Sequence, residues 1–424
     1  MVSNVATPPD HALLTEAWRA RLKARRMRAR IALLVSVSVT VIWAIAVTLF
    51  DLWPRVIGQW PASITMVFGS IVAGSTPQGG GAVAFPVFTK LLDVPAEVAR
   101  TFSLCIQTVG MSAAALSIII NRRPVEWRAV GIATTSAAVG FLLVAMLASD
   151  PSAPFRPSLL PGAYVKVTFT IVLVSMAYVV YSGTRVSVRE VHRVLPVLNA
   201  RMLMTLIVVG MLGGGSAALV GSGMDVFLYL ALVVFFTIDP KVGVPSSVVA
   251  MAIISILGFV TFGIFGQQLF VGLDAAGQVV ALGDAPVSLD ADGALVYGTG
   301  PGAPALQFDL FGLWLAAVPI VAWGAPFGSL LAARMSARRL VQFVSVLALA
   351  EVVSTAIFLS ELRTDMVLLT YAITGTALAL GLLWIVARNR ARLFRLPDIN
   401  FDASVNPERI DVADGYAASG RGGQ

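Results

Sequence analysis

Charged side chains and the residue types of most catalytic sites are scarce in this chain of 424 residues. It contains one cysteine, Cys105, two histidines, His11 and His192, and only 12% charged residues. A single thiol excludes an internal disulfide framework and a cysteine-based metal cluster. An ordinary soluble domain carries roughly 25% charged residues. With a hydrophobic fraction of 57%, this deficit indicates an integral membrane protein.

Enzyme chemistry finds little support in the sequence. Both histidines fall in segments that we expect outside the membrane, which argues against a His-metal cluster or a His-dependent triad in the core. A phosphate-binding Gly-rich Lys/Ser motif is also lacking, so ATP-driven pumping would need another subunit. Ser222 lies between two glycines, but no histidine of a membrane segment could activate it. We expect no enzyme activity, no metal and no other cofactor.

Long apolar segments recur through the chain, and a helix of about 20 apolar residues spans a bilayer core. The first, 31–53, follows a basic stretch over 1–30 and lacks a cleavage site, so we expect a retained helix. The others are 62–78, 79–94, 96–120, 126–148, 163–182, 202–220, 221–238, 246–267, 308–332, 340–360 and 367–387. The sequence therefore predicts an all-α polytopic transmembrane bundle with about 10–12 membrane segments.

The distribution of Lys and Arg orients these segments, because cytoplasmic loops carry the excess. The net charge of +7 comes from short basic blocks beside apolar runs, which indicates topology rather than nucleic-acid binding. The loops 149–162 and 268–307 are poor in Lys and Arg and should face outward. Both termini are then cytoplasmic, in an inner or plasma membrane. The polar tail, 388–424, has few apolar anchors, so we expect it to be disordered.

Two glycine-rich stretches interrupt the apolar segments, at 74–81 and at 213–223. A backbone that leaves helical geometry inside a bilayer must be satisfied by protein or by a water-filled cavity. The first interrupted unit, 62–182, is entered from outside and the second, 202–360, from inside, so the sequence predicts two inverted repeats. Broken helices in matched positions of inverted repeats are typical of secondary transporters.

The repeats have extra helices at 31–53 and 367–387. Within them, 62–94 and 202–238 are either re-entrant hairpins or pairs of full crossings, and both alternatives give the same orientation. The glycines could also serve only to let helices pack closely.

Each repeat also contains a helix start that offers hydroxyl groups. Pro95 precedes Thr101 and Ser103, and Pro240 precedes Ser246 and Ser247. Free N–H groups at a helix start favour anions. These positions therefore form a candidate anion cradle.

The sequence resembles the sulfite exporter TauE/SafE family, also called TSUP, over about 60–387. The resemblance rests on Gly79-Gly80-Gly81 with Pro86, on the block 98–103, and on its counterpart 242–247. It implies a secondary transporter, usually an exporter, of sulfite, sulfonates or other small organic anions. The second half departs from the family pattern, because it carries Gly221-Ser222-Gly223 without a following proline and adds Asp225.

The candidate substrate site combines the backbone of both breaks with nearby polar side chains. Arg100 suits an anionic head, although it could instead snorkel or pair with Glu97. Thr76 and Gln78 could donate to a substrate oxygen or only satisfy exposed backbone. The full set is Thr76, Gln78, Gly79, Gly80, Gly81, Arg100, Thr101, Ser103, Gly221, Ser222, Gly223, Ser246 and Ser247.

Two acidic residues lie within apolar segments, where a carboxylate is costly unless it is paired or faces water. Asp225 lies beside the second break and could bind a coupling proton or a cation, or cap the broken helix. Glu351 lies mid-helix and could couple protons or form a structural hydrogen bond.

We therefore expect a secondary transporter, of exporter type, that moves a small anion through the lipid bilayer by alternating access. A passive anion channel, with the breaks as its filter, and a non-transporting membrane scaffold are the alternatives.

Overall fold

The computed structural model describes residues 11–77, 79–92, 94–149, 161–183, 195, 198–283, 285–290, 293–298, 303–359 and 361–394. The longer helices are α1 (His11–Leu49), α3 (Trp60–Ser75), α5 (Ala96–Ile120), α6 (Trp127–Leu147), α7 (Gly162–Gly183), α8 (Ala200–Val220), α10 (Pro240–Gly258), α11 (Leu310–Arg334), α12 (Ala337–Phe358) and α14 (Met366–Phe394). The shorter ones are α2 (Trp53–Gly58), α4 (Gly81–Pro86), α9 (Met224–Tyr229) and α13 (Glu361–Thr364), with π-helical turns η1 (Val87–Leu91), η3 (Leu230–Phe235) and η4 (Phe259–Phe265) and a 3-10 turn η5 (Gln268–Phe270).

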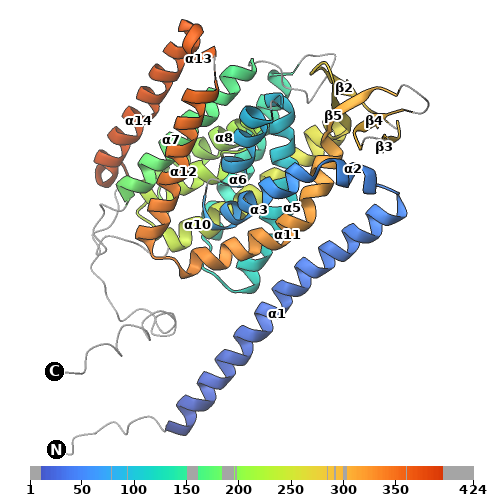
Figure 1. Cartoon of the computed structure of the whole chain (residues 1–424). Helices are drawn as coiled ribbons and strands as arrows, with labels where there is room; N and C mark the ends of the chain where they lie inside the picture. The colour runs from blue at the N-terminus through green and yellow to red at the C-terminus, as the bar shows by residue number, and fades with distance from the viewer. Residues whose placement is uncertain are drawn as a thin grey trace, which may run out of the picture.

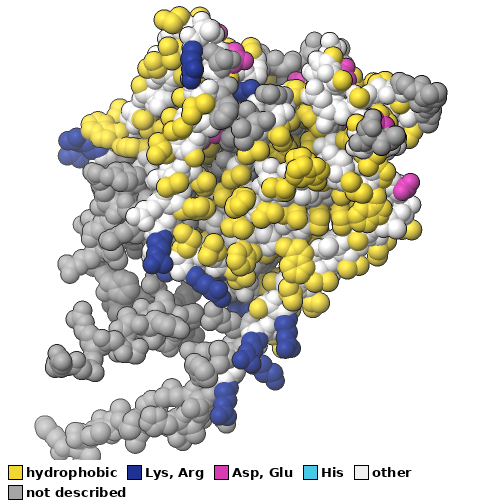
Figure 2. Space-filling model, viewed as in Figure 1, with side chains coloured by type: hydrophobic (Ala, Val, Ile, Leu, Met, Phe, Trp, Pro, Cys, Tyr) yellow, Lys and Arg dark blue, Asp and Glu magenta, His cyan; other side chains and the backbone are white. Residues whose placement is uncertain are grey.

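These helices confirm a polytopic helical membrane fold. Seven helices of the described chain are long and apolar enough to cross a membrane, and four shorter apolar helices lie at other predicted segments. Hydrophobic side chains cover a broad band of the visible face, with a run of Lys and Arg along the lower part of α1 (Figure 2). The predicted basic N-terminal segment is helical from His11 onward. The predicted disorder of the tail is wrong for its first residues, because α14 continues to Phe394, and residues 395–424 lie outside the described residues.

Both predicted helix breaks are present. In the first, α3 ends at Ser75 and α4 begins at Gly81; in the second, α8 ends at Val220 and α9 begins at Met224. Each break is followed by a short helical arm, α4 with η1 after the first and α9 with η3 after the second. At 1.5 Å per residue, the rise of an α-helix, each arm is about 17 Å long. A hydrocarbon core is about 30 Å thick, so this length favours re-entrant hairpins over full crossings.

The helices pack in pairs that join distant parts of the chain (Figure 1). Helix α3 lies along α11, α8 lies along α6, α5 packs against α10, and α7 packs against α12. Helix α1 contacts the bundle mainly through α11, where the Trp43 indole donates to the carbonyl of Leu315 at 2.9 Å. Large apolar side chains of α1 and of α14 are exposed at the surface.

Glycines bring the paired backbones into direct contact. A Cβ atom at Gly140 of α6 would collide with the backbone of Met211 in α8, and a Cβ at Gly214 would collide with the carbonyl of Ala137. Between α3 and α11, Gly74 approaches Ala325 and Gly328 approaches Ile71 in the same way. In the absence of a hydrophobic drive between helices in lipid, such close contacts provide much of the packing energy.

A five-stranded antiparallel sheet interrupts the helical pattern before α11. Its strands are β1 (Val271–Asp274), β2 (Val279–Ala281), β3 (Val287–Leu289), β4 (Leu295–Tyr297) and β5 (Ala305–Asp309), in the order β2-β1-β5-β4-β3. The register pairs Gly272 with Val280 and shifts between Leu273 and Asp274 where β1 meets β5. The sheet lies at one end of the bundle beside α2 (Figure 1). It occupies the segment 268–307, which the sequence analysis treats as an outward-facing loop of an all-α protein.

The close glycine contact between α6 and α8 predicts a position-specific loss of stability. Gly140→Ala should lower the free energy of unfolding by about 1–3 kcal/mol, because the added methyl group meets the Met211 backbone. Thermal unfolding of the detergent-purified protein measures this loss. Gly131→Ala on the same helix is the control, since a Cβ there meets no atom within 4 Å. Equal melting temperatures for both variants would contradict the packing account.

Candidate functional site

The two helix breaks meet inside the bundle. Gly79 of the first break has a φ of +66°, and a Cβ atom there would lie 2.8 Å from Oδ2 of Asp225 and 3.1 Å from Oε1 of Gln107. The hydroxyl of Ser222 lies 3.7 Å from the same point. Polar groups of both breaks and of α5 thus surround one position, which a side chain at residue 79 would fill.

Helix α5 donates hydrogen bonds to the carbonyl group of Gly221, which follows the last residue of α8 at the second break. Gln107 donates from Nε2 to the carbonyl of Gly221 at 2.9 Å, and the Ser103 hydroxyl donates to the same carbonyl at 3.1 Å. Gln107 also donates to Oγ and to the carbonyl of Ser103, at 2.8 and 3.0 Å. Ser103 therefore lies at the second break, as a residue of the candidate site should.

The second break requires glycine at two positions. Gly221 has a φ of +80°, and a Cβ atom there would lie 2.6 Å from the carbonyl oxygen of Arg100. Gly223 has a φ of +140°, and its Cβ would lie 2.7 Å from Cβ of Ser216. The Ser216 hydroxyl donates to the carbonyl of Ser222 at 3.1 Å. The backbone of this break is thus satisfied within the protein, as a membrane interior demands.

Asp225 is fully buried in the first turn of α9. Its Oδ1 accepts a hydrogen bond from the backbone N–H of Val226 at 3.0 Å. Its Oδ2 and the Oε1 of Gln107 have no hydrogen-bond partner among the described residues. Two buried acceptor atoms therefore face the space beside Gly79.

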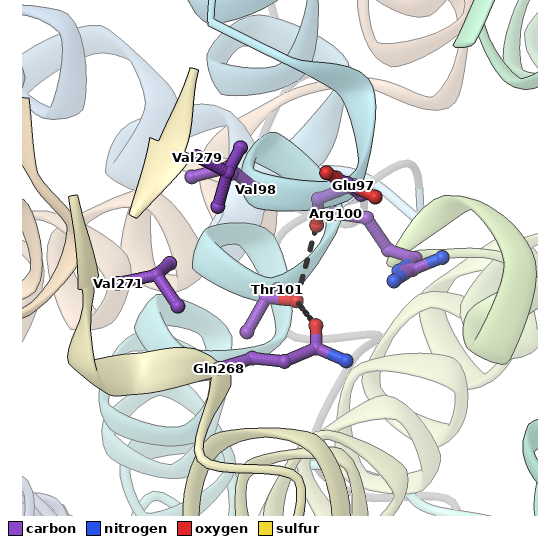
Figure 3. Close-up of a pocket in the computed structure, with 7 residues that line it drawn as sticks. All are labelled: Glu97, Val98, Arg100, Thr101, Gln268, Val271 and Val279. Carbon is purple, nitrogen blue, oxygen red and sulfur yellow. Dashed lines mark hydrogen bonds between the residues drawn. The ribbon is translucent and has the colours of Figure 1, made fainter. Parts of the chain in front are cut away.

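A pocket of about 210 Å³ opens beside the first turns of α5, between this helix and the sheet (Figure 3). Thr101 Oγ1 contacts the carbonyl of Glu97 at 3.1 Å and Oε1 of Gln268 at 2.5 Å. The Arg100 guanidinium lies over the ring of Phe262, 5.3 Å from its centroid, and points away from the pocket's valines. The lining residues are Glu97, Val98, Arg100, Thr101, Gln268, Val271 and Val279.

The hydroxyls predicted on α10 have other partners. Ser246 donates to the carbonyl of Val242 at 2.7 Å and accepts from the N–H of Glu126 at 2.9 Å. Ser247 donates to the carbonyl of Val244 at 2.9 Å. These contacts lie within α10 and at the start of α6. Neither hydroxyl is seen to form a hydrogen bond with a described residue of the two breaks.

The remaining residues predicted in the first break have mainly backbone roles. The Thr76 hydroxyl donates to the carbonyl of Val72 at 3.0 Å, within the last turn of α3. Gly80 precedes α4, its carbonyl accepts the first N–H groups of that helix, and Gly81 begins the helix. Gln78 lies outside the described residues, as does His192.

A sequence model of the sulfite exporter TauE/SafE family matches residues 62–289, more than half of the chain and both breaks. The chain belongs to the sulfite exporter TauE/SafE family. No curated protein and no solved structure matches it. Family membership identifies a multi-pass membrane transporter of the exporter type.

Gln107 is the main site residue of this TauE/SafE chain that the sequence analysis missed. It lies one helical turn after Ser103 and is buried in α5. A polar residue inside a membrane helix signals a functional or structural contact. That signal was available, but its partner, the carbonyl of Gly221, belongs to the other half of the chain.

Glu351 lies in a hydroxyl-lined contact between α12 and α7. Its Oε1 accepts from Thr170 at 2.9 Å and from Thr355 at 3.2 Å, and its Oε2 accepts from Ser354 at 3.4 Å. The carboxyl group is buried. Three hydroxyl groups therefore donate hydrogen bonds to the Glu351 carboxyl group. These hydrogen bonds offset the cost of burying a carboxyl group in the membrane.

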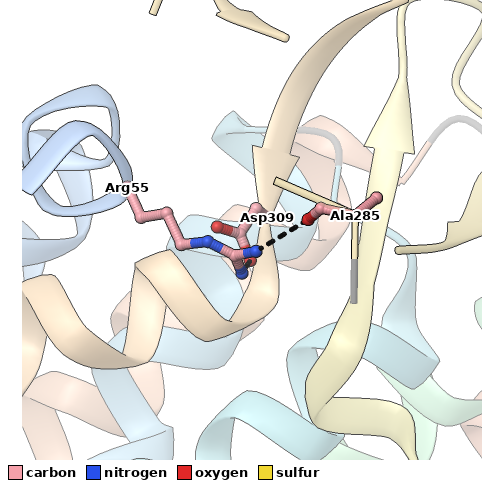
Figure 4. A network of polar contacts seen from close by, with 3 residues as sticks. All are labelled: Arg55, Ala285 and Asp309. Atoms are coloured by element: carbon pink, nitrogen blue, oxygen red, sulfur yellow. Dashed lines mark hydrogen bonds and ion pairs between the residues drawn. The ribbon is translucent and has the colours of Figure 1, made fainter. Parts of the chain in front are cut away.

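An ion pair links α2 to the end of the sheet at the start of α11 (Figure 4). Arg55 of α2 lies 3.4 Å from Oδ1 of Asp309, at the start of α11, and donates to the carbonyl of Ala285 at 3.4 Å. The guanidinium also lies over the ring of Phe311. Burial raises the pKa of the Asp309 carboxyl, and Arg55 partly opposes this shift.

Removing Arg55 should destabilise the protein in a pH-dependent way. Arg55→Gln leaves the buried Asp309 carboxylate without its cation, which should cost roughly 3 kcal/mol. Because the pKa of Asp309 is raised in the folded state, its stabilising contribution is complete at low pH and is lost as the pH rises through the folded pKa. The loss in Arg55→Gln should therefore be larger at pH 8 than at pH 5, in thermal unfolding.

The double variant Arg55→Gln/Asp309→Asn provides the control, since it removes the uncompensated charge and keeps the shape of the side chain. We expect it to recover most of the lost stability. A double variant as unstable as Arg55→Gln at pH 8 would contradict the ion-pair account.

The shared carbonyl of Gly221 predicts a non-additive pair of substitutions. Ser103→Ala or Gln107→Leu alone leaves one donor and should lower the free energy of unfolding by about 1 kcal/mol. Together they leave the carbonyl buried without a donor, so the combined loss should exceed the sum by about 1 kcal/mol. Thermal unfolding of the three variants measures the coupling, and simple additivity would refute a shared acceptor.

Proposed function

We propose that the protein is a secondary exporter of small anions, such as sulfite, sulfonates or related organic acids, which works by alternating access. The observation that carries the proposal is the meeting of the two breaks at Gly79, Ser222 and Asp225, with polar groups of α5 beside them. Secondary transporters bind substrate where broken helices of two repeats meet near the bilayer midplane.

The packing of the bundle supports two inverted repeats, 62–182 and 202–360. In such repeats, α3, α5, α6 and α7 of the first half correspond to α8, α10, α11 and α12 of the second. The α3–α11 contact then corresponds to the α8–α6 contact, and the α5–α10 and α7–α12 contacts each join two corresponding helices. The glycine contacts follow the same exchange, because Gly74 with Ala325 corresponds to Gly214 with Ala137. Ile71 with Gly328 corresponds to Met211 with Gly140, at the same spacing along each helix.

The pocket beside α5 supports an anion pathway that leads to the breaks. Arg100 supplies a positive charge and Thr101 a hydroxyl at its wall. Gln107 follows Arg100 by two turns of the helix, a rise of about 10 Å. Since Arg100 also contacts Gly221 through its backbone, α5 connects the pocket with the second break.

The proposed orientation places the sheet outside and both termini in the cytoplasm of an inner or plasma membrane. The basic run of α1 includes Arg19, Lys23, Arg26 and Arg30, and α1 leads from this end to α2 beside the sheet (Figure 1). Positively charged flanks favour the cytoplasmic side. The pocket would then open outward.

Coupling to protons is part of the proposal, with Asp225 and Glu351 as its carriers. Asp225 faces the meeting point of the breaks, whereas Glu351 lies between α7 and α12. A channel would not require a coupled carboxyl group. A scaffold would tolerate a side chain at the meeting point.

Uptake into proteoliposomes tests the function. We expect saturable flux of labelled sulfite or of a small sulfonate that responds to a pH gradient. Gly79→Ala should reduce the initial rate at least about ten-fold, because its methyl group enters the space between Asp225 and Gln107.

Gly131→Ala should transport like the wild type, since its position is exposed and open. Flux that neither saturates nor shows counterflow would favour the channel, and no flux for any anion tested would favour the scaffold. Full activity of Gly79→Ala would contradict the proposed site.

A further inference from the structure

The orientation of the Gln107 amide is determined by its neighbours. Its Nε2 lies 2.9 Å from the carbonyl oxygen of Gly221 and 3.0 Å from that of Ser103. Carbonyl oxygens only accept hydrogen bonds, so the NH₂ group must face them. The Oε1 atom must then point to the other side, where it lies 3.1 Å from the Cβ position of Gly79.

An acceptor of Asp225 faces the same space. Its Oδ1 is occupied by the N–H of Val226, and its Oδ2 lies 2.8 Å from the Cβ position of Gly79. Asp225 is 0% and Gln107 2% exposed. Neither oxygen has a hydrogen-bond donor among the described residues. Two buried acceptors that lack a hydrogen bond are costly to bury.

We propose that Asp225 carries a proton on Oδ2 and donates it in a hydrogen bond to Oε1 of Gln107. One proton converts an acceptor into a donor and satisfies both oxygens at once. A hard metal cation fits less well, because it takes about six or more oxygen ligands. The three heavy atoms nearest to the Gly79 Cβ position are oxygens of Asp225, Gln107 and Ser222.

Charged side chains do not offer an alternative partner in the described structure. Asp225 forms no ion pair with any described residue. The ionisable groups on α9 and on the helices packed against it or beside the site include Tyr229, Lys241, Arg201, Arg128, Glu97 and Arg100.

The proton site belongs to one half of the chain only. Asp225 is the second residue of α9, and the second residue of α4 is Ala82. The position of Gln107 in α5 corresponds to Met251 in α10. Despite the related packing of the halves, the described residues of the first half therefore offer no counterpart of this site.

The consequence for coupling rests on the proposed function. A neutral Asp225 admits an anion to the meeting point of the breaks, whereas an ionised Asp225 repels it. Anion binding and protonation of Asp225 are then linked, and Oδ2 exchanges its proton with water when the site opens.

Infrared spectroscopy of the purified protein tests the proton directly, without any transport assay. A protonated carboxyl group has a C=O stretching band that an ionised carboxylate lacks. The wild-type spectrum minus that of Asp225→Asn at pH 7 should show this band. In Gln107→Met the band should move to higher frequency, because the carboxylic acid loses its acceptor.

Glu361→Gln, which alters an exposed carboxyl group, is the control and should leave the band unchanged. A difference spectrum without the carboxylic acid band, in a folded Asp225→Asn protein, would overturn the proposal. A band that stays in place in Gln107→Met would also overturn the hydrogen bond to Gln107. Failure of anion flux, with the band present, would instead count against the proposed function alone.

Discussion

The hydrogen bonds from α5 to the carbonyl of Gly221 are the interaction on which the rest of the site depends. A helix that ends inside a membrane leaves carbonyl groups that water cannot reach. Ser103 and Gln107 supply the missing donors. Because the Gln107 amide turns its nitrogen to this carbonyl, its oxygen faces the space beside Gly79, which Oδ2 of Asp225 also lines. The need of the Gly221 carbonyl for a donor thus determines that Gln107 presents an acceptor to the space beside Gly79.

Glycine has two separate roles in this architecture. At Gly79, Gly221 and Gly223, positive φ values and close neighbours make any side chain costly in the breaks. At Gly74 and Gly214, glycine instead lets helices touch along their backbones. The first role forms the candidate site, and the second holds α3 against α11 and α8 against α6. The two roles explain why glycine-rich runs cover both the break and the helix before it.

The sequence could predict the breaks and most helices, because glycine clusters and apolar runs are local signals. It also identified Ser103 and Asp225, which the structure places at the breaks. It could not identify Gln107 as a site residue, because the carbonyl it binds lies in the other half of the chain. Ser246 looked equivalent to the α5 hydroxyls, yet its contact with Glu126 depends on the packing of α6.

The sheet shows a second limit of sequence reasoning. Its strands have three to five residues each, too short for a clear alternating pattern. Antiparallel pairing between β1 and β5, which lie far apart in the segment, stabilises them. The ion pair of Arg55 with Asp309 adds a contact that no local pattern reveals.

The central claim is that the two breaks meet, and cysteine cross-linking tests it most directly. In a Cys105→Ala background, which removes the chain's single native cysteine, Gly79→Cys and Ser222→Cys are introduced together and oxidised. Mass spectrometry of the digested protein should find the two peptides linked, whereas the control pair Gly131→Cys and Ser222→Cys should remain unlinked. Absence of the link in a folded protein would contradict the account.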